Sequence, residues 1–235
     1  GLRPVTRGLV SPMDNLFAPP IPMFMSEWGG QIESDPMRST LVLASHNTGK
    51  LREFSALLGP LGLTIVPQSQ LGVPEAEEPF GTFLENALAK ARHASRLTGL
   101  PALADDSGLC VDALGGMPGI HSARFAGEPK SDARNNAKLL DELAKQPNRR
   151  GHYYCVLVLV RHPDDPQPIV ADGLWRGEIL TAPSGDGGFG YDPLFRALGQ
   201  TVSVAEMDAQ LKNTLSHRGQ AMQALAARLA QINAG

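Results

Sequence analysis

Two acidic pairs, Glu77–Glu78 and Asp105–Asp106, are the side chains best suited to hold a hard cation. The second pair follows a short apolar run, so we expect it at the end of a strand, with a Ser-Gly dipeptide after it. Mg²⁺ prefers oxygen ligands and is usually held by one or two carboxylates plus phosphates. Neighbouring strand residues point to opposite faces, so only one of Asp105 and Asp106 should reach such an ion. A capping aspartate beside a solvated acidic loop would give the same pattern.

Residues 45–50 read Ser-His-Asn-Thr-Gly-Lys and lie between an expected strand and an expected helix. A glycine there lets the backbone approach a ligand, and free N–H groups beside a lysine suit phosphate. The segment is not a P-loop, because Ala44 and Leu51 stand where that motif needs Gly and Ser or Thr. A simple strand–helix turn with a solvent-exposed lysine would also account for it.

Two further segments carry more polar chemistry than packing requires. Residues 187–192, Gly-Gly-Phe-Gly-Tyr-Asp, could bring aromatic rings and backbone against a flat ring such as a purine, or could form a tight turn with two core aromatics. Ser216 is a good N-cap for the last helix, yet His217 and Arg218 follow it directly. A helix N-terminus disfavours cations, so this placement suggests a ligand, or else a surface arginine tolerated at a small cost.

The elements that must position these segments alternate between strands and helices. Apolar runs predict strands at 41–44, 63–66, 102–104, 153–160 and 169–180, and the fourth should be central because it is apolar throughout. Helical spacing predicts helices at 51–58, 83–97 and 131–145, and a last helix with Met222, Leu225, Leu229 and Ile232 on one stripe. The helix over 83–97 should bury Leu84, Leu88, Ala91 and Ser95. This alternation predicts an α/β fold whose mixed sheet is covered on both faces.

Composition excludes several classes of protein. The chain has 235 residues, of which 42% are hydrophobic, and a net charge of −3, whereas a protein that tracks duplex nucleic acid normally has a basic excess. The longest aliphatic run, residues 155–160, is far shorter than the ~20 residues of a membrane helix. Cys110 and Cys155 are typical of buried thiols in a reducing compartment, so we expect a cytoplasmic protein with no nucleic-acid or membrane partner.

Residues 1–37 differ from the rest of the chain. They hold six of the 19 prolines and four of the seven methionines, and they lack the pattern of a secretory signal. We interpret 1–37 as a flexible N-terminal extension or a remnant of expression, and 38–235 as one globular domain.

Six segments occur in an order that resembles one family. They are Ser45–Lys50, Phe83–Ala87 with Lys90–Arg92, Ala104–Gly108, Pro118–Phe125, Gly187–Pro193 and Ser216–Ala221. This series is similar to the Ham1/RdgB family of inosine/xanthosine triphosphate pyrophosphatases, over about residues 40–233. The first loop has Ser-His where many members have Thr-Gly or Thr-Ser, which leaves Asn47 and Lys50 in place.

The resemblance implies a fold, a set of site residues and a reaction. The fold is a long mixed sheet bent between two helical lobes, with the nucleotide in a central cleft, usually in a homodimer. Glu78 and Asp106 would hold Mg²⁺, with Asp106 also acting as general base. The implied substrate contacts are Ser45, His46, Asn47, Thr48, Gly49, Lys50, Lys90, Ser107, Phe189, Gly190, Tyr191, Asp192, Lys212, His217 and Arg218.

The implied reaction is hydrolysis of ITP, dITP or XTP to the monophosphate and pyrophosphate, which would keep these nucleotides out of DNA and RNA. Three alternatives remain open at this point. A P-loop NTPase would release the γ-phosphate, but its motif is missing. A Maf-type pyrophosphatase would share the architecture and differ in base preference. A non-catalytic nucleotide-binding module would lack a carboxylate, whereas Glu78, Asp105 and Asp106 are all present.

Overall fold

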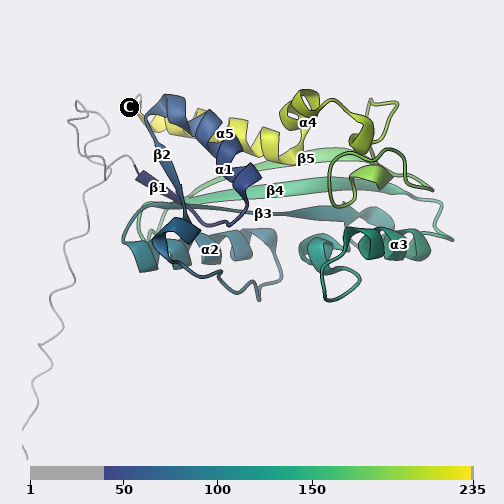
Figure 1. Cartoon of the computed structure of the whole chain (residues 1–235), viewed down its shortest axis with the longest axis horizontal. Coiled ribbons are helices and arrows are strands. Elements are labelled where there is room, and N and C mark those ends of the chain that lie inside the picture. The colour runs from purple at the N-terminus through teal and green to yellow at the C-terminus, as the bar shows by residue number, and fades with distance from the viewer. Residues whose placement is uncertain (1–39, 234–235) are drawn as a thin grey trace, which may run out of the picture.

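A six-stranded mixed β-sheet forms the centre of the molecule (Figure 1), which the computed structural model describes over residues 40–233. The strands follow the spatial order β2-β1-β3-β4-β5-β6; β1 is parallel to β2 and β3, and the remaining neighbours are antiparallel. Their bounds are β1 Thr40–Leu43, β2 Thr64–Pro67, β3 Ala102–Val111, β4 Arg150–Val160, β5 Ile169–Ile179 and β6 Phe195–Ala197. The fold predicted from the sequence, a mixed sheet in an α/β protein, is confirmed, including the central place of β4.

Helices cover both faces of this sheet (Figure 1). The helices are α1 Thr48–Leu58, α2 Phe83–Thr98, α3 Asp132–Glu142, α4 Ala209–Leu215 and α5 His217–Asn233. In Figure 1, α1, α4 and α5 lie above the strands and α2 and α3 lie below them. None of the helices described for residues 40–233 is long and apolar enough to cross a membrane. Residues 1–37, interpreted above as an extension, lie outside the described residues.

Alternation along the strands explains why the two faces differ. Leu41, Leu43 and Leu103 point to the face that α1 and α5 cover, in a core built from large side chains. Their neighbours Val42 and Ala104 point to the other face, where small alanines of α2 pack against the strands. A third cluster, around Trp175 and Phe195, fills the end of the sheet beside α3 and β6. The alternation of side chains along β3 therefore decides whether each of its polar residues faces α1 and α5 or faces α2.

Two details of the predicted elements are wrong. Asp105 and Asp106 lie in the middle of β3 rather than at a strand end, because β3 continues through the Asp-Asp-Ser-Gly segment to Val111. On α2, Leu84 is 44% exposed, whereas Asn86 is buried. Asn86 occupies the buried face because its amide group bonds both the N–H and the carbonyl oxygen of Phe80, at 3.1 and 3.3 Å.

Other boundaries differ by smaller amounts. The predicted helix over 131–145 ends at Glu142, and Ser131 caps it, since its Oγ accepts from the N–H of Arg134 at 3.3 Å. The predicted stripe of the last helix is buried at Met222, Leu225 and Leu229, but Ile232 is 37% exposed. The elements β6 and α4 were not expected, because each is too short to show a clear periodicity.

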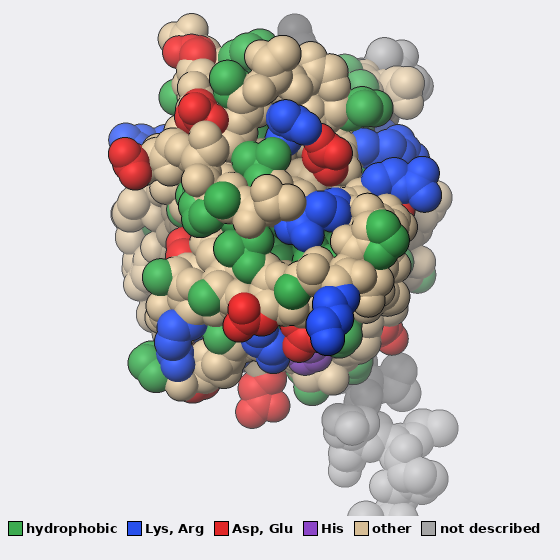
Figure 2. Space-filling model, turned by 90° about the vertical axis from the view of Figure 1, so that its right-hand side faces the viewer, with side chains coloured by type: hydrophobic (Ala, Val, Ile, Leu, Met, Phe, Trp, Pro, Cys, Tyr) green, Lys and Arg blue, Asp and Glu red, His purple; other side chains and the backbone are tan. Residues whose placement is uncertain are grey.

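The end of the molecule on the right of Figure 1 has mixed polarity. Figure 2 looks onto this end and shows Lys and Arg side chains interspersed with Asp and Glu side chains, around a hollow where hydrophobic side chains are visible. This face carries no large area of one sign of charge.

Candidate active site

The segment over residues 45–50 leads from β1 into the first turn of α1. Asn47 is the N-cap, and its Oδ1 accepts from the N–H groups of Gly49 and Lys50 at 2.8 and 3.1 Å. Ser45 Oγ accepts from the N–H of Asn47 at 3.1 Å. The expectation of free backbone N–H groups here is therefore wrong for these three residues, because local side chains already bond them. What the turn does provide is a fixed direction for the side chain of Lys50.

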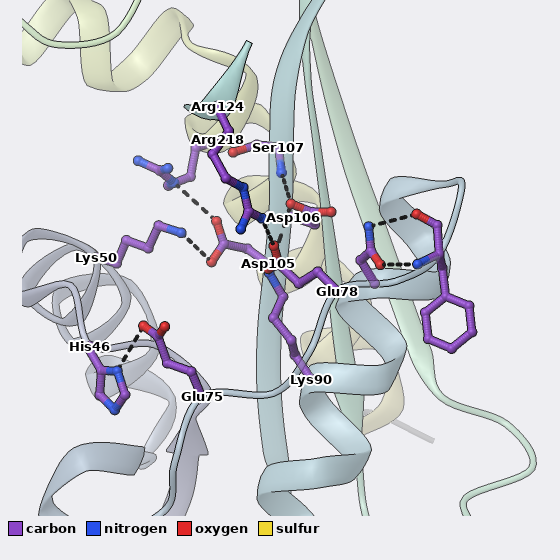
Figure 3. A network of polar contacts seen from close by, with 12 residues as sticks. His46, Lys50, Glu75, Glu78, Lys90, Asp105, Asp106, Ser107, Arg124 and Arg218 are labelled. Carbon is purple, nitrogen blue, oxygen red and sulfur yellow. Dashed lines mark hydrogen bonds and ion pairs between the residues drawn. The ribbon is translucent and has the colours of Figure 1, made fainter. Parts of the chain in front are cut away.

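His46 points away from α1 towards the loop that precedes α2. Its Nδ1 lies 3.0 Å from Glu75 Oε1, and this hydrogen bond is the main cause that lowers the pKa of Glu75 (Figure 3). The same loop carries Glu78, so His46 joins the turn at α1 to the loop of the predicted metal ligand.

Lys50 belongs to a group of charges that we call the Asp105 cluster: Asp105, Lys50, Arg218 and Glu53. Lys50 Nζ lies 2.8 Å from Asp105 Oδ1, so the lysine is not simply a solvent-exposed side chain. Arg218 Nε lies 3.7 Å from Asp105 Oδ2, and Arg218 Nη1 lies 3.6 Å from Glu53 Oε2. Burial alone would raise the pKa of Asp105, but Lys50 and Arg218 outweigh it and hold the pKa well below its usual range.

The other face of β3 carries the Asp106 cluster: Asp106, Glu78, Lys90 and Arg124 (Figure 3). Lys90 Nζ lies 2.5 Å from Glu78 Oε1 and 3.8 Å from Asp106 Oδ1. Arg124 Nη2 lies 3.5 Å from Glu78 Oε2. Burial raises the pKa of Asp106 to about 6, since the repulsion of Glu78 adds to it and the attraction of Lys90 offsets only part. The predicted separation of Asp105 and Asp106 onto opposite faces is thus what the structure has.

The Asp106 cluster fits the magnesium site expected from the sequence. Glu78 and Asp106 supply oxygen atoms on the same side of β3, and both interact with Lys90. Burial and the neighbouring Glu78 both raise the pKa of Asp106, and a divalent cation bound between the two carboxylates would favour its ionised form. Across residues 40–233 no group of three Asp, Glu, His or Cys side chains is arranged to hold a metal. Two carboxylates suit Mg²⁺, because this ion commonly takes its other ligands from water and phosphate.

A cavity of about 550 Å³ opens beside Ser107 and receives side chains from both lobes. Lining residues that the sequence predicted are Ser107, Phe189, Gly190, Tyr191, Asp192, Lys212, His217 and Arg218. The remaining predicted residues, Ser45–Lys50, Lys90, Glu78 and Asp106, are not part of this lining. The site therefore has two parts, a cavity and a charged region around β3, and Arg218 belongs to both.

The loop over residues 187–192 presents one of its two aromatic rings. Phe189 is 64% exposed at the cavity, with Lys212 Nζ 4.6 Å from the centre of its ring. Tyr191 is buried, and its hydroxyl donates to the carbonyl oxygen of Ser122 at 2.8 Å. Asp192 fixes the loop, since its carboxylate accepts from the N–H of Phe189 at 2.8 Å and contacts Lys212 Nζ at 2.5 Å. Of the two aromatic rings in this loop, Phe189 is the one placed to stack on a flat ring.

Two glycines allow close packing at the start of α5, Gly173 against the sheet and Gly219 against α4. A Cβ at Gly173 of β5 would meet the carbonyl oxygen of His217, and one at Gly219 would meet that of Asn213. His217 stacks on Tyr153, with ring centres 4.8 Å apart and planes inclined by 12°. Burial lowers the pKa of His217 to about 3.

The interpretation of His217 as a second cation at this helix start is therefore wrong, because the ring is largely enclosed against Tyr153 and its lowered pKa makes it neutral at pH 7. Arg218 does carry charge there, but Asp105 and Glu53 offset it. Its position thus has an explanation within the protein, besides the ligand suggested by the sequence.

Sequence reasoning missed the parts that Glu53, Arg124 and Tyr153 play. Glu53 lies one turn after Lys50 on α1, so helical spacing could have indicated it. Arg124 falls within the segment Pro118–Phe125, whose approach to Glu78 no local pattern reveals. Tyr153 was expected only as part of a central strand.

Comparison with known proteins gives a consistent result. A family model described as the Ham1 family matches residues 41–228. The dITP/XTP pyrophosphatase of Chromobacterium violaceum is 67% identical over 193 residues, covering 82% of this chain and 98% of the relative. That of Aromatoleum aromaticum is 65% identical over 195 residues, with coverage of 82% and 98%.

Solved structures agree with these relatives. A HAM1 protein from Coxiella burnetii has a TM-score of 0.80 and 45% identity, covering 82% of this chain and 98% of that chain. The Ham1 protein of Staphylococcus aureus has a TM-score of 0.77 and 37% identity, with the same coverage.

Proposed function

The chain belongs to the Ham1 family and is a nucleoside triphosphate pyrophosphatase, and we propose that its substrates are the non-canonical purine nucleotides dITP, ITP and XTP. Water attacks the α-phosphorus, the bond from that phosphorus to the bridging oxygen breaks, and the monophosphate and pyrophosphate leave. The observation that carries this proposal is the cavity beside Ser107, next to a strand with a carboxylate on each face.

Asp106 is the proposed general base. Without a bound metal its pKa is about 6, so the carboxylate is mostly ionised at neutral pH, and bound Mg²⁺ would favour that ionised form further. The proton lost by the attacking water moves to a carboxylate oxygen of Asp106. Glu78 and Asp106 are the proposed ligands of Mg²⁺, which when bound neutralises phosphate charge and favours departure of pyrophosphate.

Lys50 and Lys90 are the proposed partners of the triphosphate. Each is paired with a carboxylate, Lys50 with Asp105 and Lys90 with Glu78, so each ammonium group is held in place before substrate arrives. Asn47 acts through the backbone by capping α1, which directs Lys50. Charges fixed in advance stabilise developing negative charge without reorganisation during the reaction.

The base is proposed to lie against Phe189, with Lys212, Asp192, His217 and Arg218 around it. A 6-oxo group accepts hydrogen bonds, and both the Arg218 guanidinium and one nitrogen of the neutral His217 ring can donate them. Adenine presents a 6-amino donor at that place, which would leave buried donors unpaired. A site of this kind rejects the wrong base by about 10⁴-fold or more, so dATP should be a very poor substrate.

We further propose that the enzyme acts in the cytoplasm as a homodimer and removes these nucleotides before they enter DNA or RNA. The name dITP/XTP pyrophosphatase of a relative supports the substrates on which this role depends, and the unbridged Cys110 and Cys155 support a reducing compartment. Analytical ultracentrifugation of the full chain tests the dimer, and a mass of one chain would contradict it.

The products and a substrate panel test the function directly. We expect dITP and XTP to yield one pyrophosphate each with added Mg²⁺, and dATP to be cleaved about 10⁴-fold more slowly in kcat/KM. Release of orthophosphate from the γ-position would contradict the pyrophosphatase assignment. A preference for pyrimidine triphosphates would instead favour the Maf-type alternative.

A further inference from the structure

Asp105 joins two parts of the site that the proposed function treats separately. It lies on β3 with 1% of its side chain exposed, between Lys50 of α1 and Arg218 of α5 (Figure 3). Lys50 belongs to the proposed phosphate contacts, whereas Arg218 lines the cavity proposed for the base. One carboxylate thus contacts a cation from each part.

The two contacts of Asp105 differ in closeness. Oδ1 accepts a short hydrogen bond from Lys50 at 2.8 Å. Oδ2 is 3.7 Å from Arg218 Nε, and within residues 40–233 neither of these two buried atoms has a hydrogen-bond partner. Arg218 is therefore attracted by Asp105 without being locked to it by a hydrogen bond.

The charges of the Asp105 cluster balance without substrate. Lys50 and Arg218 carry two positive charges, and Asp105 and Glu53 carry two negative ones. Lys90 also attracts Asp105, from the α2 face of the sheet. In a buried group of this kind, a change at one cation alters how strongly the shared carboxylate holds the other.

We propose that Asp105 is a positioning residue that couples recognition of the base to the grip on the triphosphate, through its shared contacts with Arg218 and Lys50. A base that accepts a hydrogen bond from Arg218 while the guanidinium stays beside Asp105 leaves that carboxylate shared, so Lys50 is free to turn to the triphosphate. A base that displaces Arg218 from Asp105 leaves the carboxylate to hold Lys50 alone, and the lysine then binds the triphosphate less well.

This inference rests on the proposed function, but inorganic triphosphate allows it to be tested without turnover. This ligand has no base, so a residue that contacts only the base should not affect its binding. We expect Arg218→Gln to raise the Kd of inorganic triphosphate about fivefold in calorimetry, because Asp105 then holds Lys50 alone and more tightly. Phe189→Ala is the matched control, since Phe189 lines the same cavity away from Asp105, and should change this Kd less than about twofold.

A second variant separates coupling from direct attraction by the Arg218 charge. In the Asp105→Asn background, Arg218→Gln should change the Kd of inorganic triphosphate less than about twofold, whereas Asp105→Glu should retain the fivefold effect. If Asp105→Asn does not fold, Lys50→Gln replaces it, with the same expectation of less than twofold. An unchanged Kd in Arg218→Gln, or a fivefold effect that persists without Asp105 or Lys50, would overturn the coupling. Failure to hydrolyse dITP would overturn the proposed substrate and leave this measurement valid.

Discussion

Asp105 and Asp106 are adjacent in sequence, yet the structure gives them opposite environments. Asp105 is 1% exposed and contacts two cations, Lys50 and Arg218. Asp106 is 14% exposed and shares Lys90 with a second carboxylate, Glu78. The pKa of Asp105 is held far below its usual range, whereas burial raises that of Asp106 to about 6.

The difference shows that burial alone does not decide how a carboxylate behaves. Both side chains lose contact with water, which by itself favours the protonated form. On the Asp105 face the cations outweigh that loss, so the carboxylate is stable and unreactive. On the Asp106 face burial outweighs the attraction of Lys90, and the nearby carboxylate of Glu78 adds to it, so Asp106 binds a proton more readily than an ordinary aspartate does. We therefore assign Asp105 to positioning Lys50 and Arg218, and Asp106 to proton transfer and metal binding.

Replacing Asp106 gives the largest expected effect. Asp106→Asn removes both the proposed base and part of the metal charge, so kcat for dITP should fall about 10³-fold or more while the protein still folds. Pyrophosphate release measures the loss, and circular dichroism checks the fold. Asp141→Asn, an exposed change on α3, is the control. Turnover like that of the wild type in folded Asp106→Asn would remove Asp106 from the mechanism.

Asp105→Asn should instead act mainly on stability. It leaves the partly buried Lys50 and Arg218 without their shared carboxylate, so we expect a loss of unfolding free energy near the lower end of the about 3–5 kcal/mol that breaking a buried ion pair costs. Urea denaturation at pH 7 measures it. Asp112→Asn is the matched control, because Asp112 is 46% exposed and its pair with Arg150 is long at 3.7 Å; we expect a change below about 0.5 kcal/mol. A loss below about 0.5 kcal/mol at Asp105 as well would show that its contacts with Lys50 and Arg218 do not stabilise the fold.

Arg218→Ala tests whether this contact of Asp105 also recognises the base in the cavity. It removes a donor for the 6-oxo group, so kcat/KM for ITP should fall far more than for ATP, narrowing the gap between them by about 10²-fold. Steady-state kinetics with both nucleotides measures this, and thermal melting separates lost recognition from lost stability. An equal fall for both substrates would assign Arg218 to the phosphates or to structure rather than to the base.

The sequence predicted the mixed sheet well because β4 has a long apolar run, and β1, β2 and β3 contain short ones, whose strand preference depends little on distant contacts. It also predicted that Asp105 and Asp106 diverge, since strand alternation is local. Their place in the middle of β3 was missed, because Asp, Ser and Gly are typical of loops and only the pairing with β4 keeps them in a strand.

The sequence could not predict which charged side chains contact each other when they are far apart along the chain. The motif at residues 216–219 indicated two cations, but burial against Tyr153 makes His217 neutral. Likewise, nothing local shows that Lys50 meets Asp105, 55 residues further along the chain. Charge balance depends on such distant contacts, so the roles of charged residues are harder to predict than the elements that carry them.

The smallest expected effect is a change in the free energy of unfolding when either aspartate is replaced by asparagine. It distinguishes the two residues best, because the change should have opposite signs at Asp105 and Asp106. The pKa of Asp106 is raised in the folded protein from about 3.8 to about 6, so between these values the folded state binds more protons than the unfolded one. Stability without metal therefore falls as the pH rises through this range, by about 3 kcal/mol at most. Partial exposure screens this loss, and we expect about 2 kcal/mol.

Asp106→Asn removes this ionisation, so at pH 7 in EDTA the variant should be more stable than the wild type by about 2 kcal/mol, whereas Asp105→Asn should be less stable. Below about pH 4 Asp106 is protonated in both states, and the gain of Asp106→Asn should disappear. Urea denaturation across pH 3.5–8 measures both limits. Equal destabilisation by the two variants at pH 7 would show that Asp106 is held by its partners as firmly as Asp105, and the distinction between the two faces of β3 would fail.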